Sequence, residues 1–150
     1  MIISFCGHSN FVTTKEYEQI LLSFFYDRVG DYSAEMYLGD YGNFDSFAYR
    51  CCELYKKTHP KVSLAFVTPY LDNDYLTKRL LYRENNYDSI IYPEIEDKPK
   101  RFAISYRNKF MIDKADCVVA YVTHSFGGAY STYRYAKSKC KEIFNLGKFE

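Results

Sequence analysis

Four short segments of the chain hold residue types that bind or transform small ligands: glycine, serine, threonine, asparagine and histidine. These segments are residues 7–10, 39–43, 68–70 and 123–128. Each follows an apolar run typical of a buried strand, and three of them lead into a helical pattern. Backbone N–H groups and small side chains at a helix start can hold an anion such as phosphate. A single glycine after a strand can serve only to make a turn, but the shared composition of these loops favours a nucleotide-type ligand.

The most informative local pattern is the run from residue 127 to residue 132. Gly127 and Gly128 allow the backbone to approach a ligand closely, and Ser131 and Thr132 fall in the first helical turn, where their hydroxyl groups could add donors. The spacing matches neither G-x-G-x-x-G nor G-x-x-x-x-G-K-[ST], so we expect neither the dinucleotide fingerprint nor a kinase-type phosphate loop. The alternative is a helix start preceded by a glycine turn.

Arg107 and Asn108 lie in a helical pattern, next to its apolar stripe. An arginine beside a buried stripe needs a partner, and the planar guanidinium matches phosphate geometry. The sequence leaves two partners open. One is an anion in a cleft, and the other is a local carboxylate, Asp113 or Asp116.

The candidate catalytic residues are Asp40, Asp45 and His8. Asp45 could cap the helix that follows it or accept a ribose hydroxyl. His8 and His124 both follow strands and could flank one substrate, although a loop histidine often only makes a surface hydrogen bond. Because no G-x-S-x-G motif occurs, we do not expect Ser9 to be a nucleophile.

Together these patterns define the predicted ligand-binding residues. They are Gly7, His8, Ser9, Gly39, Gly42, Asp45, Pro69, Arg107, Asn108, Gly127, Gly128, Ser131 and Thr132.

The cysteines and histidines give no sign of a metal site. The five cysteines contain no C-x-x-C pair, and the three histidines have no ligand spacing among themselves or with the cysteines. Cys6 and Cys117 lie inside apolar runs, where a free cysteine behaves as a small buried hydrophobe. We therefore expect reduced thiols and no metal.

Alternating strands and helices must bring these loops together. Apolar runs rich in β-branched and aromatic residues predict strands, and apolar residues at helical spacing predict helices. Residues 94–100 are charged and bounded by prolines, which predicts a loop. We predict strands at residues 2–6, 33–38, 62–67, 89–92, 117–122 and 142–146, and helices at 15–29, 44–57, 74–83, 103–114 and 129–139.

This order is typical of an α/β fold: a Rossmann-like, doubly wound and mostly parallel sheet with helices on both faces. No change in composition marks a second domain, so we expect residues 1–150 to form a single domain. In such a sheet, ligands bind at the carboxyl ends of the strands, where the four segments lie. The strand order is not predicted.

Several motifs follow one another in a recognisable order. They are Cys6-Gly7-His8-Ser9, Gly39-x-x-Gly42-x-x-Asp45, Leu64-x-x-Val67-x-Pro69-Tyr70, Arg107-Asn108-x-x-Met111, and Gly127-Gly128-Ala129. Together they resemble, nearly end to end, the SLOG superfamily of Rossmann-like domains, which is related to the Lonely Guy (LOG) phosphoribohydrolases and to the DNA-processing protein A fold. The pattern is most similar to the small bacterial and phage SLOG proteins. The resemblance implies a nucleotide or nucleotide-derived ligand.

The chain departs from the LOG enzymes at the catalytic motif. LOG-type phosphoribohydrolases carry P-G-G-x-G-T-x-x-E, whose glutamate acts on the ribosyl bond, with an Arg-Lys pair upstream. In an ungapped comparison, Phe126 replaces the proline, Arg134 replaces the glutamate, and Asn108 stands in place of the lysine. A cation cannot position water or stabilise an oxocarbenium-like centre as the acid does. The phosphate-binding loop is thus retained without the hydrolytic acid.

Composition sets further expectations about partners. The chain has 20 Lys and Arg against 19 Asp and Glu, a net charge of +1. A near-neutral protein lacks the electrostatic field that attracts a polyanion, so we expect no nucleic-acid partner.

The longest apolar run of the chain is too short for a membrane span of ~20 residues, and the start of the sequence lacks signal-peptide features. We therefore expect a cytoplasmic protein. Seventeen tyrosines exceed what the core needs and suggest a homodimer.

Three functions remain open. The leading hypothesis is a sensor or regulatory domain that binds a nucleotide or nucleotide-derived ligand and requires no cofactor. The alternative is an enzyme: a nucleotide N-glycosidase, a phosphoribohydrolase or a deoxyribosyltransferase-like protein that uses Asp40 or Asp45 with help from His8 or His124. Single-stranded nucleic-acid binding by tyrosines and the basic residues Arg134, Lys137, Lys139 and Lys141 is the third, and the low net charge argues against it.

Overall fold

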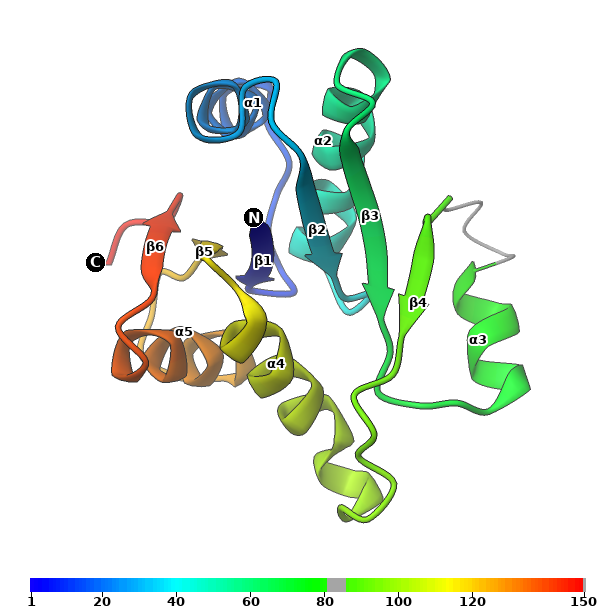
Figure 1. The fold of residues 1–150 in the computed structure, drawn as a ribbon. Helices are drawn as coiled ribbons and strands as arrows, with labels where there is room; N and C mark the ends of the chain where they lie inside the picture. Colours follow the sequence, from blue (N-terminus) through cyan, green and yellow to red (C-terminus); the bar gives the residue numbers. More distant parts are fainter. Residues whose placement is uncertain (81–85, 150) are drawn as a thin grey trace.

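The computed structural model describes residues 1–80 and 86–149 (Figure 1). Its strands are β1 (Ile2–Gly7), β2 (Ala34–Leu38), β3 (Val62–Val67), β4 (Ser89–Ile91), β5 (Cys117–Tyr121) and β6 (Glu142–Asn145). Its helices are α1 (Lys15–Arg28), α2 (Asn43–Thr58), α3 (Asn73–Leu80), α4 (Ala103–Lys114) and α5 (Gly128–Ser138), with a 3-10 turn, η1 (Lys100–Phe102). Every predicted strand and helix is present. Residues 81–83, the predicted end of the third helix, lie outside the described residues.

The strands form one sheet in the order β4-β3-β2-β1-β5-β6, and every adjacent pair is parallel. The predicted Rossmann-like α/β class is therefore confirmed. After β1 the chain adds β2, β3 and β4 on one side, and it then crosses back to place β5 on the other side of β1. This reversal creates a crevice at the carboxyl ends of β1 and β5, which is where open α/β sheets bind ligands.

Helices cover both faces of the sheet. α1 and α2 lie together near the top of Figure 1, and α4 and α5 lie together near the bottom. Because successive side chains of a strand point to opposite faces of the sheet, β5 packs against the helices on both faces. Cys117 and Val119 pack in the cluster that contains α1 and α2, whereas Val118 and Ala120 pack in the cluster that contains Ala136 of α5.

The five cysteines are free thiols in the structure. Four are buried, Cys6, Cys51, Cys52 and Cys117, and Cys140 is exposed. Burial, with a smaller contribution from the charge of Asp45, raises the pKa of Cys6 to about 12. Burial likewise raises the pKa of the Cys51, Cys52 and Cys117 thiols, which favours the protonated form and a packing role.

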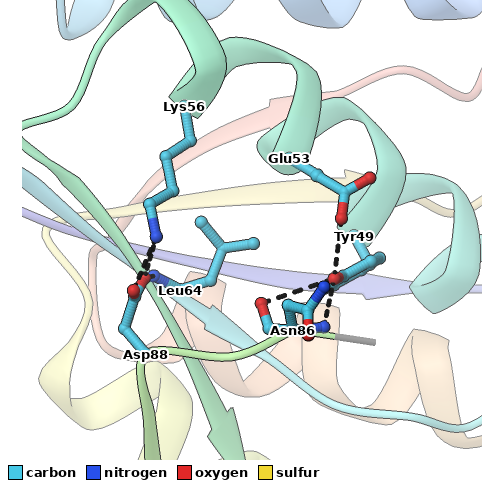
Figure 2. Close-up of polar contacts among 6 residues, drawn as sticks. All are labelled: Tyr49, Glu53, Lys56, Leu64, Asn86 and Asp88. Carbon is cyan, nitrogen blue, oxygen red and sulfur yellow. Dashed lines mark hydrogen bonds and ion pairs between the residues drawn. The ribbon is translucent and has the colours of Figure 1, made fainter. Parts of the chain in front are cut away.

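Polar contacts attach α2 to the segment that leads into β4 (Figure 2). Lys56 Nζ donates to both carboxylate oxygens of Asp88, at 2.5 and 2.7 Å. The Leu64 N–H of β3 donates to Asp88 Oδ2 at 2.8 Å, and the Asn86 N–H donates to the Tyr49 hydroxyl at 2.5 Å. Burial opposes ionisation of Asp88, but Lys56 and the Leu64 N–H outweigh it and lower the pKa of the Asp88 carboxyl. The edge strand β4 is thus held to the helix above it.

Tyrosines occur both in the core and on the surface. Tyr37, Tyr49 and Tyr55 are buried, whereas Tyr26 and Tyr32 are exposed. The predicted homodimer stays a prediction. In residues 1–80 and 86–149, no helix combines the length and the apolar character that crossing a membrane requires.

Candidate functional site

A cavity of about 420 Å³ opens at the carboxyl ends of β1 and β5. Its walls come from the β1–α1 loop, the β2–α2 loop, the inner side of α4, and the β5–α5 loop with the start of α5. Of the predicted ligand-binding residues, the cavity is lined by Gly7, His8, Ser9, Gly39, Asp45, Arg107, Asn108, Gly127, Gly128 and Thr132. The parallel sheet therefore brings most of the predicted set to one place.

The remaining predicted residues do not line the cavity. Gly42 precedes α2 with φ +96°, and a Cβ there would lie 2.6 Å from that of Ser9, so the position requires glycine for packing. Pro69 is buried and lines a separate depression beyond β3. Ser131 is exposed, and Asp40 is buried outside the cavity wall.

The N-terminus of α5 forms one wall of the cavity. Gly127 precedes the helix with φ +91°, which favours glycine, and no side chain caps the helix. A Cβ added at Gly127 or Gly128 would meet nothing within 4 Å. The first intrahelical bond is donated by the Ser131 N–H to the Gly127 carbonyl. In the described part of the chain, no protein group accepts from the Gly128 and Ala129 N–H groups. They remain available to an anion.

Arg107 forms a second wall, although it is only 3% exposed. Its Nη1 donates to the Val67 carbonyl at 2.8 Å, and its Nε donates to Asn108 Oδ1 at 2.8 Å. Among the described residues, none accepts a hydrogen bond from Nη2. Neither of the carboxylates considered above, Asp113 and Asp116, is its partner, since both bond to other groups. Arg107 is therefore held by neutral acceptors with one terminal nitrogen left for a ligand.

Asp45 lies beside Arg107 at the cavity wall. Its Oδ2 accepts the Tyr41 N–H at 2.8 Å, so the carboxylate supports the β2–α2 loop and does not cap α2. Burial raises the pKa of Asp45 to about 6, against the opposing effects of the Arg107 charge and the Tyr41 N–H. Asp45 is the one carboxylate among the described residues that line this cavity. It could accept a hydroxyl proton when ionised or donate a proton when neutral.

His8 lies in an aromatic stack at the cavity wall. Its ring is parallel to that of His124 with centroids 3.7 Å apart, and the His124 ring lies 3.9 Å from that of Phe126. His8 Nε2 accepts the Thr123 N–H at 3.0 Å. Burial, together with His124, lowers the pKa of His8. Because its Nε2 lone pair is occupied, neutral His8 cannot take a proton from a substrate at that atom.

Two other residues that the sequence singled out, Thr132 and Arg134, have a limited role in the cavity. The Thr132 hydroxyl donates to the Gly128 carbonyl at 3.0 Å, so its hydrogen is already used within α5. Arg134, at the position of the LOG glutamate, is exposed and does not line the cavity.

No group of three or more His, Cys, Asp and Glu side chains within residues 1–80 and 86–149 could hold a metal ion.

Sequence reasoning missed Phe126 and Tyr41, which both line the cavity. Phe126 is 70% exposed at one end of the aromatic stack, and Tyr41 is 59% exposed. The sequence did contain an indication of both residues. Each is an aromatic residue in a glycine-containing loop that follows a strand, where the hydrophobic core does not require an aromatic side chain.

No family model matches the sequence, and no curated protein matches it. Among solved structures, the chain is similar to DNA processing protein A from Helicobacter pylori, which was described for its single-stranded DNA binding mode. The two share 17% identity with a TM-score of 0.63 over 97% of this chain and 64% of that one. At this identity the likeness establishes the fold alone, and the chain spans less than two thirds of that protein. Membership of the SLOG superfamily stays a prediction.

This comparison contradicts the expectation that nucleic acid is not a partner, because a single-stranded DNA-binding protein shares the fold. The expectation used the net charge, which averages two unlike parts of the chain. Residues 98–149 carry 11 Lys and Arg against 3 Asp and Glu. Since the whole chain has 20 Lys and Arg and 19 Asp and Glu, the remaining residues carry 9 Lys and Arg and 16 Asp and Glu. A near-neutral total therefore hides a strongly basic segment.

Proposed function

We propose that the cavity at the carboxyl ends of β1 and β5 binds a nucleotide unit through its phosphate. The observation that carries this proposal is the presence of two anion-binding elements, on two walls, in the lining of a single cavity. The uncapped start of α5 offers the Gly128 and Ala129 N–H groups, and buried Arg107 offers Nη2. A helix N-terminus and a guanidinium are both suited to phosphate oxygens.

Other features of the cavity suit the rest of a nucleotide. Its volume of about 420 Å³ falls within the range of small-molecule sites. The Asp45 carboxylate can accept a ribose hydroxyl, and Asn108 holds Arg107 in place through Nε. This arrangement is suited to a sensor or regulatory domain that needs no further cofactor.

The proposal is tested by calorimetric titration with nucleoside mono- and diphosphates, cyclic nucleotides and ADP-ribose. We expect at least one to bind, and ligand at a hundredfold its Kd should stabilise the fold by ~2.7 kcal/mol. Arg107→Met should weaken binding by more than tenfold, whereas Arg50→Met removes an exposed arginine outside the cavity and should leave it unchanged. Absence of binding by every compound at millimolar concentration would refute the proposal.

One observation favours an enzymatic alternative: the pKa of Asp45 is raised to about 6, which suits a general acid near neutral pH. In that case neutral Asp45 would protonate the departing base as the C1′–N bond breaks, water would add to C1′, and the proton that the water loses would return to the Asp45 carboxylate. Release of free base from a nucleoside monophosphate, lost in Asp45→Asn but kept in Asp27→Asn, would support this alternative. If purified protein releases no base from any of the four common monophosphates, this enzymatic alternative is refuted.

A further inference from the structure

Cations and aromatic rings alternate across the outer side of α4 and α5. Lys98 Nζ lies 5.4 Å from the centre of the Tyr106 ring, and Lys109 Nζ lies 5.6 Å from that same ring. Lys109 Nζ also lies 5.7 Å from the Tyr135 ring, and Lys139 Nζ lies 5.4 Å from it. These five residues form a continuous series that crosses from one helix to the other, which we call the α4–α5 ladder.

The ladder is open to a ligand. Lys98, Lys109 and Lys139 are exposed, and both tyrosine rings are half-buried. Beside it, Arg101 lies over Phe102 at 4.8 Å and Lys114 lies over Phe110 at 5.9 Å. The same arrangement of cation and ring thus extends along α4.

Few acidic groups accompany the cations of α4 and α5, although Asp72 and Glu96 line a depression together with Lys98 and Lys100. The Asp113 carboxylate accepts the Tyr135 hydroxyl at 2.7 Å, and Asp97 lies 4.0 Å from Lys98. Asp116, the other carboxylate of the basic segment before β6, accepts the Ile2 N–H at the far end of β5. The face therefore carries a local positive charge that the net charge of +1 conceals.

We propose that the α4–α5 ladder binds single-stranded nucleic acid. Lysine ammonium groups pair with phosphates, and a tyrosine ring offers a π-face on which an unpaired base can stack. Exposed, hydrated lysines can leave the rings for phosphates, which frees the ring faces for bases. Other polyanions would use the lysines but would gain nothing from the tyrosines between them, so the alternation favours a single strand.

This surface is separate from the cavity. Arg107 and Lys109 lie on the same helix, but the first is buried at the cavity wall and the second is exposed on the ladder. The two sites can therefore be disabled independently. Failure of one proposal would not decide the other.

The test measures fluorescence anisotropy of a labelled oligothymidylate of about 12 nucleotides on the whole chain at several salt concentrations. We expect Lys109→Gln with Lys139→Gln to weaken binding and to reduce the slope of log K against log salt by about 1.4, the value for two lost contacts with a single strand. Lys57→Gln with Lys61→Gln is the matched control, because it removes two exposed lysines from α2 and from the loop before β3, which are not part of the ladder. Circular dichroism verifies that each variant is folded.

Tyrosine substitutions separate stacking from charge. Tyr106→Leu should weaken oligonucleotide binding roughly tenfold, whereas Tyr106→Phe should retain it. Equal affinity for a duplex of the same length, or binding to anionic phospholipid vesicles but not to the oligonucleotide, would overturn the proposal. So would oligonucleotide binding that Arg107→Met abolishes and the lysine pair leaves intact, since the strand would then occupy the cavity.

Discussion

The Asp45 carboxylate and the Arg107 guanidinium lie together at Gly39. A Cβ at this glycine would lie 3.0 Å from Asp45 Oδ2 and 3.2 Å from both Nη1 and Nη2 of Arg107. Glycine thus leaves room for an acid and a base at the carboxyl end of β2. The acid is only partly compensated, because burial still raises the pKa of Asp45 to about 6.

Replacement of Asp45 by asparagine should change the pH dependence of stability. The pKa of Asp45 is raised on folding, so its stabilising proton is fully present below pH 3.8 and is lost as the pH rises through about 6. Asp45→Asn mimics the protonated side chain. We expect it to exceed the wild type by about 2–3 kcal/mol in free energy of unfolding at pH 8 and to match it at pH 4. Urea denaturation at both pH values measures this difference. Asp27→Asn, an exposed control, should show no such trend, and a destabilised Asp45→Asn at pH 8 would contradict the assignment.

Two glycines at the cavity should respond differently to alanine. In Gly128→Ala the new methyl group meets nothing within 4 Å and lies in a first helical turn, so stability should change by less than about 1 kcal/mol. In Gly7→Ala the methyl group would lie 2.3 Å from ring atoms of fully buried Phe44, and we expect a loss of about 2–3 kcal/mol. Nucleotide affinity should nevertheless fall at least fivefold in Gly128→Ala. Unchanged affinity in that variant would exclude the start of α5 from the site.

His8 should remain neutral where an ordinary histidine becomes charged. Its pKa is lowered by burial and by His124, and protonation at Nε2 would break the bond from the Thr123 N–H. The contribution of neutral His8 to stability is therefore present above pH 6.5 and is lost as the pH falls through its lowered pKa. A titration of the histidine ring signals by NMR should give His8 a midpoint below 6.5. A midpoint above that value would show that its ring is free to act as a base.

Asp88 should stabilise the fold by more than its ion pair with Lys56 contributes, because its carboxylate also accepts the Leu64 N–H. Asp88→Ala leaves the half-buried Leu64 N–H without its side-chain acceptor, and we expect a loss of about 1–2 kcal/mol. Lys56→Met removes only a partly exposed ion pair and should cost less than about 1 kcal/mol. Denaturation by urea at neutral pH compares the two. Equal losses would mean that the ion pair, and not the backbone contact, supports β4.

The sequence predicted the fold closely because local patterns decide it. The runs at residues 62–67 and 103–114 have the same bounds in the structure as in the prediction, and the other ends within the described residues coincide or differ by one residue, except the end of the third helix. Strand order could not be predicted, since it depends on packing between distant segments. The position of β5 beside β1, which creates the cavity, is a relationship of that kind.

The site was predictable in location but not in detail. Glycines after strands pointed to the correct edge of the sheet, yet Gly42 is required by contact with Ser9 and lies outside the cavity wall. Ser131 and Thr132 were predicted together, but adjacent residues on a helix point about 100° apart, so only Thr132 lines the cavity. The exclusion of nucleic acid failed because a total charge contains no information about where the charges lie.

The most direct test of the central claim is an NMR titration of uniformly ¹⁵N-labelled protein with a nucleoside monophosphate. We predict the largest changes in the amide signals of Gly128 and Ala129 and in the side-chain Nε–H signal of Arg107, with the changes lost in Arg107→Met. Changes confined to residues outside the cavity, or their persistence in Arg107→Met, would contradict the account.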